Sequence, residues 1–410
     1  MENASPFHSP AFRLFWSARL VSAAGFWMDQ VTTGWLALEV GGGPAAVGIV
    51  MAFRLLPFLL FGLIAGAAAD RFARRSVLIG VGAFGAIVAV ILAFLALLGA
   101  VSLWQIVVLA FLSGVSSVFD MPARTAMAVD LVGRSALARA VALNAVAFYF
   151  FGAVGAFAGG QFIVSFGVTG AYLGIAAFHL IGLMLIAMVR VPERLQVGPR
   201  APIAIGQTLI DGWRMVRDNT AVRIVVIVSV CVELFGYSYQ TAVPPLARDI
   251  LNVGAVGLGT LAASASIGAT LSVVGLSFLP SNIPRGPMMS AVILLWGVAQ
   301  IGLGLAPTFA FAVAAMVLAG ACSAAVDALQ QTLVQLAVPE EQRGRAMGVW
   351  VCSIGTNSLG FLQVGLVGGA FGPAAALLLN GGMAILSAGF AQLVAPSYRW
   401  LRRPAELEPI

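Results

Sequence analysis

The sequence has few charged residues and no lysine at all. Only 9% of its 410 residues are charged, and all 22 basic residues are arginine. An average soluble domain has roughly 25% charged residues, and a water-soluble surface of this size needs many more than this chain supplies. Hydrophobic residues make up 60% of the chain, and the mean hydropathy is +1.00. These properties exclude a water-soluble globular protein and predict a polytopic membrane protein.

Cysteine and histidine are almost as rare. The three cysteines, Cys231, Cys322 and Cys352, lie in apolar stretches without a CxxC pair, so neither disulfides nor zinc are indicated. His8 and His179 stand alone, which leaves no metal ligand set and no catalytic base for an intramembrane enzyme. No P-loop is present. We therefore expect a protein that is not an enzyme and uses no metal, ATP or other cofactor.

The basic residues do not form a nucleic-acid interface. The net charge is +6, but the arginines occur in short clusters between apolar runs, without a basic face of interleaved aromatic residues. The first apolar segment is too long for a cleavable signal peptide and lacks a small-residue cleavage site. A GxGxxG pattern at 80–85 lies inside an apolar run with no strand before it, so it predicts helix packing and no dinucleotide site.

The apolar runs are long enough for twelve transmembrane helices. A helix needs about 20 apolar residues to cross a hydrocarbon core about 30 Å thick, and continuous rather than alternating runs favour helices over a β-barrel. The predicted spans are 14–38, 46–68, 77–98, 103–121, 140–164, 168–189, 224–246, 255–278, 288–306, 309–332, 346–369 and 373–396. An even number of spans places both termini on the same side of the membrane.

The arginines also predict the orientation. With the N-terminus inside, 19 of the 22 arginines fall in predicted cytoplasmic segments, which is a strong positive-inside signal. Only Arg248 falls outside, and Arg19 and Arg54 lie within spans. We expect a multi-pass protein of a bacterial inner membrane with both termini in the cytoplasm.

A polar stretch divides the spans into two sets of six. Within it, the segment IGQTLIDGWRMVRDN has apolar residues at helical spacing, which predicts an amphipathic helix on the membrane surface. These apolar residues are Leu209, Ile210, Trp213 and Val216. We expect an N-terminal bundle at 1–189, a linker with this helix at 190–222, and a C-terminal bundle with a cytoplasmic tail at 223–410. A plain linker is the alternative.

The two sets of spans contain matching residues at a nearly constant offset. Ala46-Val47-Gly48 matches Ala255-Val256-Gly257 at an offset of 209, and Ser116, Asp120 and Thr125 match Ser323, Asp327 and Thr332 at an offset of 207. Parallel repeats of six spans with a binding site near the midplane are typical of transporters. We predict an all-α membrane protein whose twelve transmembrane helices form two pseudo-symmetric six-helix bundles.

Several motifs resemble the major facilitator superfamily. The stretch GAAADRFARR resembles its signature loop between spans two and three, although Ala73 stands where a second glycine is usual. The segments from Phe119 to Asn144 and from Leu333 to Trp350 resemble the enterobactin-exporter-like branch. FGAVGAFAGG resembles the fifth-span motif of drug:proton antiporters, with Phe151 and Ala156 replacing its first glycine and its proline. The resemblance implies the major facilitator fold and transport by alternating access.

The resemblance also implies a cluster that closes the cytoplasmic side. Gly66 allows close helix approach, and Asp70 is expected to accept from backbone N–H groups at a helix start near 344–346, where the dipole favours an anion. Arg71, Arg74 or Arg75 is expected to bridge to Asp120, in one transport state only. The alternative is that the arginines only set topology. The expected gating residues are Gly66, Asp70, Arg71, Arg74, Arg75, Asp120, Arg124 and Asp327.

Charged residues inside the spans are candidates for proton coupling, because each costs about 2.5–3.5 kcal/mol on insertion scales. Asp29 and Arg54 lie at similar depth, so we expect them to pair. Such a pair either releases its carboxylate to bind a proton during transport or is a static structural contact. Glu233 has no obvious basic partner, and desolvation favours its protonated form. We place the transported proton on Glu233 ahead of Asp29.

Aromatic and hydrogen-bonding residues near Glu233 and in spans five and ten suit a bulky amphipathic ligand. The candidates are Tyr149, Asn144, Tyr237, Tyr239, Gln240, Gln330 and Gln331. The alternative is that most of them pack against helices or lipid. We predict a monomer that exports a siderophore or drug in exchange for protons and contacts membrane lipid. The alternatives are an importer, a lysolipid-type flippase or a non-transporting membrane sensor of the same fold.

Overall fold

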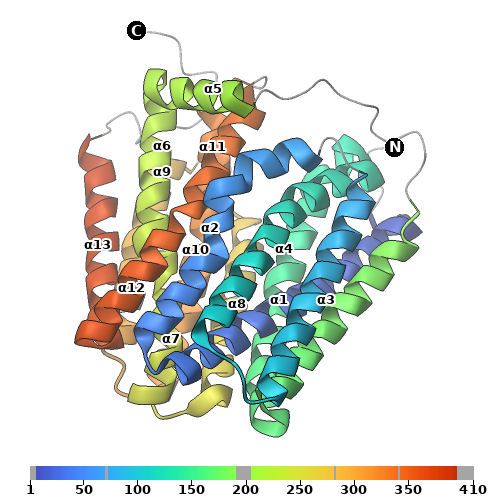
Figure 1. Cartoon of the computed structure of the whole chain (residues 1–410). Coiled ribbons are helices and arrows are strands. Elements are labelled where there is room, and N and C mark those ends of the chain that lie inside the picture. Colours follow the sequence, from blue (N-terminus) through green and yellow to red (C-terminus); the bar gives the residue numbers. More distant parts are fainter. Residues whose placement is uncertain (1–5, 70–72, 191–204, 281–282, 340–341, 395–410) are drawn as a thin grey trace.

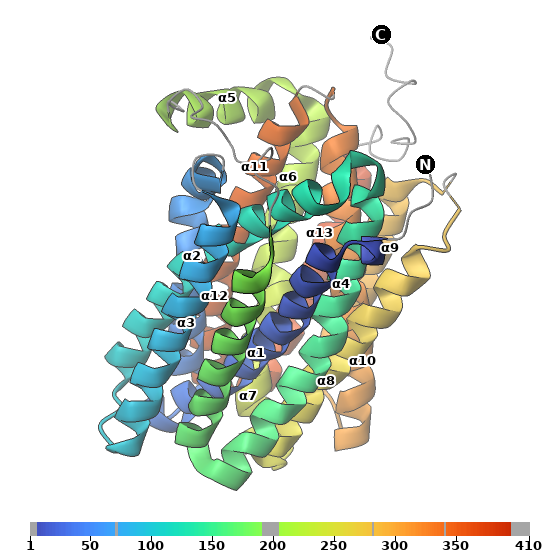
Figure 2. The ribbon, with the colours of Figure 1, turned by 90° about the vertical axis from the view of Figure 1, so that its right-hand side faces the viewer.

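The computed structural model describes residues 6–69, 73–190, 205–280, 283–339 and 342–394. Nine segments of this described part are long and apolar enough to cross a membrane. One of them, Ala142–Met188, is broken into two spans at Gly167, and Pro373–Gly389 is a shorter apolar helix. Most helices run in one common direction, and α5 (Ile205–Asp218) lies across them at one end (Figure 1). The view in Figure 2 shows α5 at the same end of the molecule. We call this the α5 end and the other one the opposite end.

The first half of the chain forms six spans from four helices. These are α1 (Pro10–Gly41), α2 (Pro44–Ala69), α3 (Arg74–Leu97) and α4 (Leu103–Met188). The 86-residue α4 is broken at Gly133 and Gly167, where φ is 73° and 68°. This left-handed conformation favours glycine, because a Cβ would be strained there. The two breaks divide α4 into three spans, which correspond to predicted spans four, five and six.

The second half also forms six spans, two of which are interrupted. Its elements are α6 (Thr220–Phe235), the 3-10 helix η3 (Tyr237–Ala242), α7 (Val243–Pro245), the π-helix η4 (Leu246–Ile250), α8 (Gly254–Leu276), α9 (Arg285–Gly304), α10 (Phe309–Leu336), α11 (Arg343–Gly355), α12 (Asn357–Phe371) and α13 (Pro373–Val394). The elements from α6 to η4 form one span, as do α11 and α12. The predicted fold of two six-helix bundles is confirmed.

Capping residues explain where several spans begin. Ser9 Oγ accepts a hydrogen bond from Phe12 N at 3.3 Å at the start of α1. Thr308 at the start of α10 caps its helix in the same way. Gly42 ends α1 with a φ of 74°. These local signals stop the apolar runs at the two ends of the bundle, because a helix end leaves backbone groups without partners.

Small residues allow the helices to approach closely. A Cβ on Gly320 in α10 would lie 1.9 Å from the carbonyl oxygen of Ala265 in α8, and a Cβ on Gly114 in α4 would lie 2.0 Å from that of Arg54 in α2. Helix association in membranes depends on such van der Waals packing between small residues. The Gly114 contact also fixes the backbone that carries the Arg54 side chain.

We expect Gly320→Ala to lower the stability of the C-terminal bundle. The added methyl group displaces α10 from α8, because the atom it meets is backbone, and overpacking of this kind typically costs about 1–3 kcal/mol. The matched control is Gly275→Ala on α8, where a Cβ meets no atom within 4 Å. The melting temperature of the detergent-purified protein measures the difference. Equal melting temperatures for both variants contradict the packing described here.

The linker between the halves contains α5, which packs against the second half. A Cβ on Gly212 would lie 3.2 Å from Val349 in α11, and Val216 packs against the main hydrophobic core. The Trp213 side chain is 68% exposed. The side chains of Leu209 and Ile210 lie outside the described residues. The domain boundaries and the contact of α5 with a membrane surface stay predictions.

Candidate functional site

A cavity lies between the two halves of the molecule. It contains about 610 Å³ of empty space, counting the open solvent at its mouth. The first half supplies Trp27, Gln30, Val31, Met51 and Tyr149, and the second half supplies Tyr239, Gln240, Val243, Pro244, Leu258, Ala262, Ala265, Ser266, Ala269, Met316, Gly320 and Ser323. The wall is mainly apolar, with a few amide and hydroxyl groups. Such a lining suits an amphipathic small molecule.

Three of the predicted substrate residues line this cavity, namely Tyr149, Tyr239 and Gln240. The other four, Tyr237, Gln330, Gln331 and Asn144, are not among its lining residues, and their role in substrate binding stays a prediction. Tyr237 lies behind the wall and donates from its hydroxyl to the Ser323 carbonyl at 3.0 Å. Gln330 is fully buried and accepts from Trp350 Nε1 at 3.1 Å.

The last two predicted substrate residues, Gln331 and Asn144, differ in their hydrogen bonding. Gln331 Nε2 donates to Asp327 Oδ2 at 3.2 Å. The Oδ1 atom of Asn144 is buried and has no hydrogen-bond partner among the described residues. Sequence reasoning missed Trp27, Gln30 and Met51 on the first half. Gln30 is a polar residue inside an apolar span, so a signal for it was present in the sequence.

The two halves meet closely at the opposite end. A Cβ on Gly48 in α2 would lie 2.6 Å from the Cα atom of Gly365 in α12. Arg248 Nη1 donates to the Leu38 carbonyl across the halves at 3.1 Å. A Cβ on Gly160 in α4 would lie 2.4 Å from the Ala255 carbonyl oxygen in α8. These contacts join the two halves at the opposite end.

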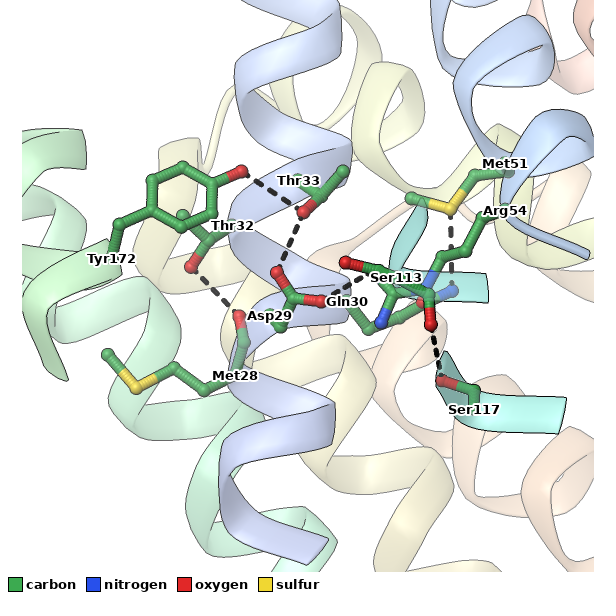
Figure 3. A network of polar contacts seen from close by, with 10 residues as sticks. All are labelled: Met28, Asp29, Gln30, Thr32, Thr33, Met51, Arg54, Ser113, Ser117 and Tyr172. Carbon is green, nitrogen blue, oxygen red and sulfur yellow. Dashed lines mark hydrogen bonds and ion pairs between the residues drawn. The ribbon is translucent and has the colours of Figure 1, made fainter. Parts of the chain in front are cut away.

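Asp29 and Arg54 form an ion pair inside the first bundle (Figure 3). Arg54 Nη1 lies 2.6 Å from Asp29 Oδ2, with side chains 8% and 15% exposed. Thr33 donates to Asp29 Oδ1 at 3.0 Å and also shares a hydrogen bond of 3.1 Å with the Tyr172 hydroxyl. The guanidinium of Arg54 lies 5.4 Å from the Phe26 ring centroid. The predicted pairing is confirmed, and its role in proton coupling stays a prediction.

We expect Arg54→Gln to destabilise the protein more than the double variant Asp29→Asn/Arg54→Gln. The single variant leaves a buried carboxylate without its cation, which typically costs about 3–5 kcal/mol, whereas the double variant removes both charges. The control is Arg217→Gln, which breaks the exposed pair of Arg217 and Asp218 and leaves the melting temperature unchanged. A double variant as unstable as the single one contradicts this interpretation of the pair.

Glu233 and Asp327 are two acidic groups in the second bundle. Glu233 is 4% exposed, and among the described residues neither carboxylate forms an ion pair with a basic side chain. Both carboxylates belong to membrane-spanning helices of the second half, Glu233 on α6 and Asp327 on α10. This arrangement suits a site that holds a proton.

The helix that carries Glu233 is interrupted just after it, which the sequence analysis did not predict. The Gly236 carbonyl accepts from Gln300 Nε2 at 3.3 Å, and Asn380 Nδ2 donates to Ser238 Oγ at 2.7 Å. Buried side chains of neighbouring helices thus satisfy polar groups at the break, as a bilayer interior requires. The sequence signals for it were Gly236 and the Pro244-Pro245 pair.

The expected bridge from Arg74 or Arg75 to Asp120 is not formed in this conformation and stays a prediction for another transport state. Asp120 is instead held by Arg124 on the same helix, with Nη2–Oδ1 at 2.6 Å and Nε–Oδ2 at 2.9 Å. Arg74 forms an ion pair with Asp130. Residues four apart on one helix face each other, so Arg124 lies within reach of Asp120.

The remaining predicted gating residues are placed as follows. Arg75 donates to backbone carbonyls at the end of α4, with Nε 3.4 Å from Ile186 O. Gly66 lies near the end of α2. Asp70 and Arg71 lie outside the described residues, and so does the expected contact of Asp70 with the helix start at 344–346.

Comparison with known families identifies the chain. The profile of the family described as transmembrane secretion effector matches residues 1–400. The chain belongs to this family of the major facilitator superfamily. This transporter also resembles curated relatives over most of its length. It is 22% identical to the staphyloferrin A transporter of Staphylococcus aureus, over 88% of this chain and 90% of that protein.

Two further relatives have similar identities. The multidrug efflux pump Tap of Mycolicibacterium fortuitum is 26% identical over 81% of this chain and 82% of that protein. The enterobactin exporter of Salmonella typhimurium is 24% identical over 91% of this chain and 89% of that protein. This transporter is therefore similar to these proteins over most of its length, at low identity.

Solved structures show the same fold. The nucleoside transporter NupG matches with a TM-score of 0.77 and 14% identity, over 92% of this chain and 99% of that one. A bacterial homologue of the lysosomal transporter Spinster, described as inward-facing and occupied, matches with a TM-score of 0.75 and 16% identity over 100% of both chains. These matches establish the fold of a multi-pass transporter.

Proposed function

We propose that this transporter exports a bulky amphipathic small molecule, such as a siderophore or a drug, in exchange for protons. The observation that supports the proposal best is the cavity between the bundles, which both halves line and which contacts at the opposite end close. A cavity lined by two repeats and closed at one end is what alternating access requires of a single state. The relatives that carry siderophores and drugs support the same substrate class.

Proton coupling is supported by the acidic residues of both bundles. Asp327 lies four residues after the wall residue Ser323 on α10, and Glu233 lies six residues before the wall residue Tyr239. Asp29 is adjacent in sequence to the wall residue Gln30. A carboxyl group that gains a proton in one state and loses it in the other couples substrate movement to the gradient. Glu233 is the proposed carrier, with the pair of Asp29 and Arg54 as a second coupling element.

The proposed membrane orientation follows the arginines. The α5 end is the cytoplasmic face of a bacterial inner membrane, so the closed opposite end faces outward and the cavity is an inward-facing one. In this state the substrate enters from the cytoplasm or the inner leaflet. The transporter acts as a monomer surrounded by lipid, because each chain supplies both halves of the cavity.

Transport in proteoliposomes tests this proposal. Purified wild-type protein is reconstituted, a pH gradient is imposed, and the movement of a catecholate siderophore, a citrate-based siderophore and ethidium is followed. We expect gradient-dependent movement of at least one compound, opposite to the proton flux, that stops when an ionophore collapses the gradient. Movement that is indifferent to the gradient contradicts proton exchange and favours a uniporter or a flippase.

A further inference from the structure

A cluster of two arginines and one aspartate lies in the first bundle, one layer of aromatic rings from the cavity. Arg19 on α1 places its guanidinium 4.5 Å from the centroid of the Phe148 ring on α4. Phe148 contacts two cavity residues, Trp27 at 5.8 Å and Tyr149 at 5.3 Å between ring centroids. Arg19 is eight residues before Trp27 on α1, which is about 12 Å toward the α5 end.

The charges in this cluster do not balance. Both oxygens of Asp120 are occupied by Arg124, and the charged groups that act on Arg19 are Arg124 and Asp120. Two guanidinium groups therefore share one carboxylate, which leaves one positive charge in excess inside the bundle. A buried charge without a counter-charge is costly. Among the described residues, no second carboxylate acts on this cluster.

The hydrogen bonds of the cluster are also incomplete. Arg19 Nε and Arg124 Nη1 are buried, and neither has a partner among the described residues. Arg19 remains partly exposed, and no hydrogen bond of its side chain to another described residue is found. Buried polar groups are normally satisfied, so unused guanidinium donors mark a place for an acceptor that comes from elsewhere.

We propose that Arg19 and Arg124 bind an anionic group of the transported solute, such as a carboxylate, on its way from the α5 end to the cavity. The inference rests on the proposed function and narrows its substrate class to amphipathic organic anions. Guanidinium groups bind carboxylates and phosphates through paired hydrogen bonds. The aromatic rings of Phe148, Tyr149 and Trp27 then hold the apolar part of the same molecule.

The second bundle explains why the anion site is confined to the first. At the offset of 207 residues, Asp120 corresponds to Asp327 and Arg124 corresponds to Gln331. Gln331 donates to Asp327 at the same spacing of four residues, but it carries no charge. The first bundle therefore presents an excess positive charge and the second an acidic group. A solute that carries an anion is drawn to the first bundle and kept from the second.

Equilibrium binding of two matched probes tests the proposal. N-dansylglycine and N-dansylglycinamide differ only in a carboxylate against a neutral amide, and their fluorescence on binding is measured with detergent-purified full-length protein. We expect the wild type to bind the carboxylate about tenfold more tightly, as charge-assisted hydrogen bonds provide. Arg19→Gln removes this preference, whereas Arg13→Gln, a charge-matched change at an exposed position on the same helix, retains it.

A second variant keeps the test decisive if Arg19→Gln does not fold. Asp120→Asn releases both arginines, so the preference for the carboxylate rises above that of the wild type. Equal affinity of the wild type for both probes, or no binding of N-dansylglycine, overturns the proposal. A preference that survives Arg19→Gln and does not rise in Asp120→Asn overturns it as well.

The same guanidinium groups suit the phosphate of a lipid headgroup, and a further arm separates the two sources. The measurement is repeated in nanodiscs of phosphatidylcholine with and without phosphatidylglycerol. Unchanged binding of N-dansylglycine supports binding of a solute anion at this site. Its displacement by phosphatidylglycerol overturns that assignment and shows that the site binds a lipid headgroup. Equilibrium binding needs no pH gradient, so a protein that fails to couple transport to protons can still show the preference for the carboxylate probe. Conversely, gradient-driven transport by a protein without that preference refutes the anion site and leaves proton exchange standing.

Discussion

Replacing Glu233 by Gln abolishes accumulation of substrate against its gradient while leaving substrate exchange intact. A gradient of one pH unit supplies about 1.4 kcal/mol per proton, so one-for-one exchange accumulates substrate about tenfold. Glutamine has nearly the same shape as glutamate and cannot release a proton at this buried position. The accumulation ratio of the variant therefore falls to one, because the gradient no longer acts on the transport cycle.

The control for this variant is Glu39→Gln. Glu39 is exposed at the opposite end of α1 and accepts a hydrogen bond from Trp35 Nε1 at 2.6 Å, which glutamine also accepts. We expect Glu39→Gln to accumulate substrate to the same ratio as the wild type. Counterflow of labelled substrate, measured without a pH gradient, shows that Glu233→Gln still binds and moves substrate. Full accumulation by Glu233→Gln would contradict Glu233 as the proton carrier and leave Asp29 and Asp327 as the candidates.

Replacing Gly48 by Val shifts the protein away from the conformation described here. A Cβ on Gly48 would lie 2.6 Å from Gly365 Cα and 2.8 Å from the Phe361 carbonyl, and both atoms belong to backbone that cannot rotate away. Overpacking of about 1–3 kcal/mol shifts a two-state equilibrium by about 5- to 150-fold. The contact joins the two bundles, so the cost is relieved when the opposite end opens.

Distances between spin labels measure this shift. Labels at Val40 and Ile250 report on the opposite end, since both side chains are exposed there and belong to different halves. We expect a longer distance to dominate in Gly48→Val and a shorter one in the wild type. The control, Gly80→Val on α3, adds a side chain where a Cβ meets no atom within 4 Å. An unchanged distance distribution in Gly48→Val contradicts closure by this contact.

The fold follows from the sequence because a bilayer limits the solutions. Apolar runs of the required length fix the spans, and the breaks at Gly133 and Gly167 fall between predicted spans. The pair of Asp29 and Arg54 was predictable for a similar reason, since two residues at equal depth on adjacent spans have few other partners. The depth of a residue in the bilayer follows from its position along its span.

Contacts that depend on helix rotation were not predictable. The sequence does not show which face of α10 holds Gln330, and the structure turns it toward Trp350 and away from the cavity. The partner of Asp120 was missed because the resemblance drew attention to another loop, although Arg124 stands four residues away. The break after Glu233 depends on Gln300 and Asn380, which lie on distant helices.

In the proposed mechanism, substrate and protons move in opposite directions through one transporter. The most direct measurement follows the pH of the proteoliposome lumen with a pH-sensitive dye. The vesicles are loaded with substrate and diluted into substrate-free buffer, with no pH gradient imposed. Proton exchange predicts that the lumen acidifies as substrate leaves, and that Glu233→Gln vesicles show no such change. Substrate that leaves wild-type vesicles while the lumen stays at constant pH would contradict the account.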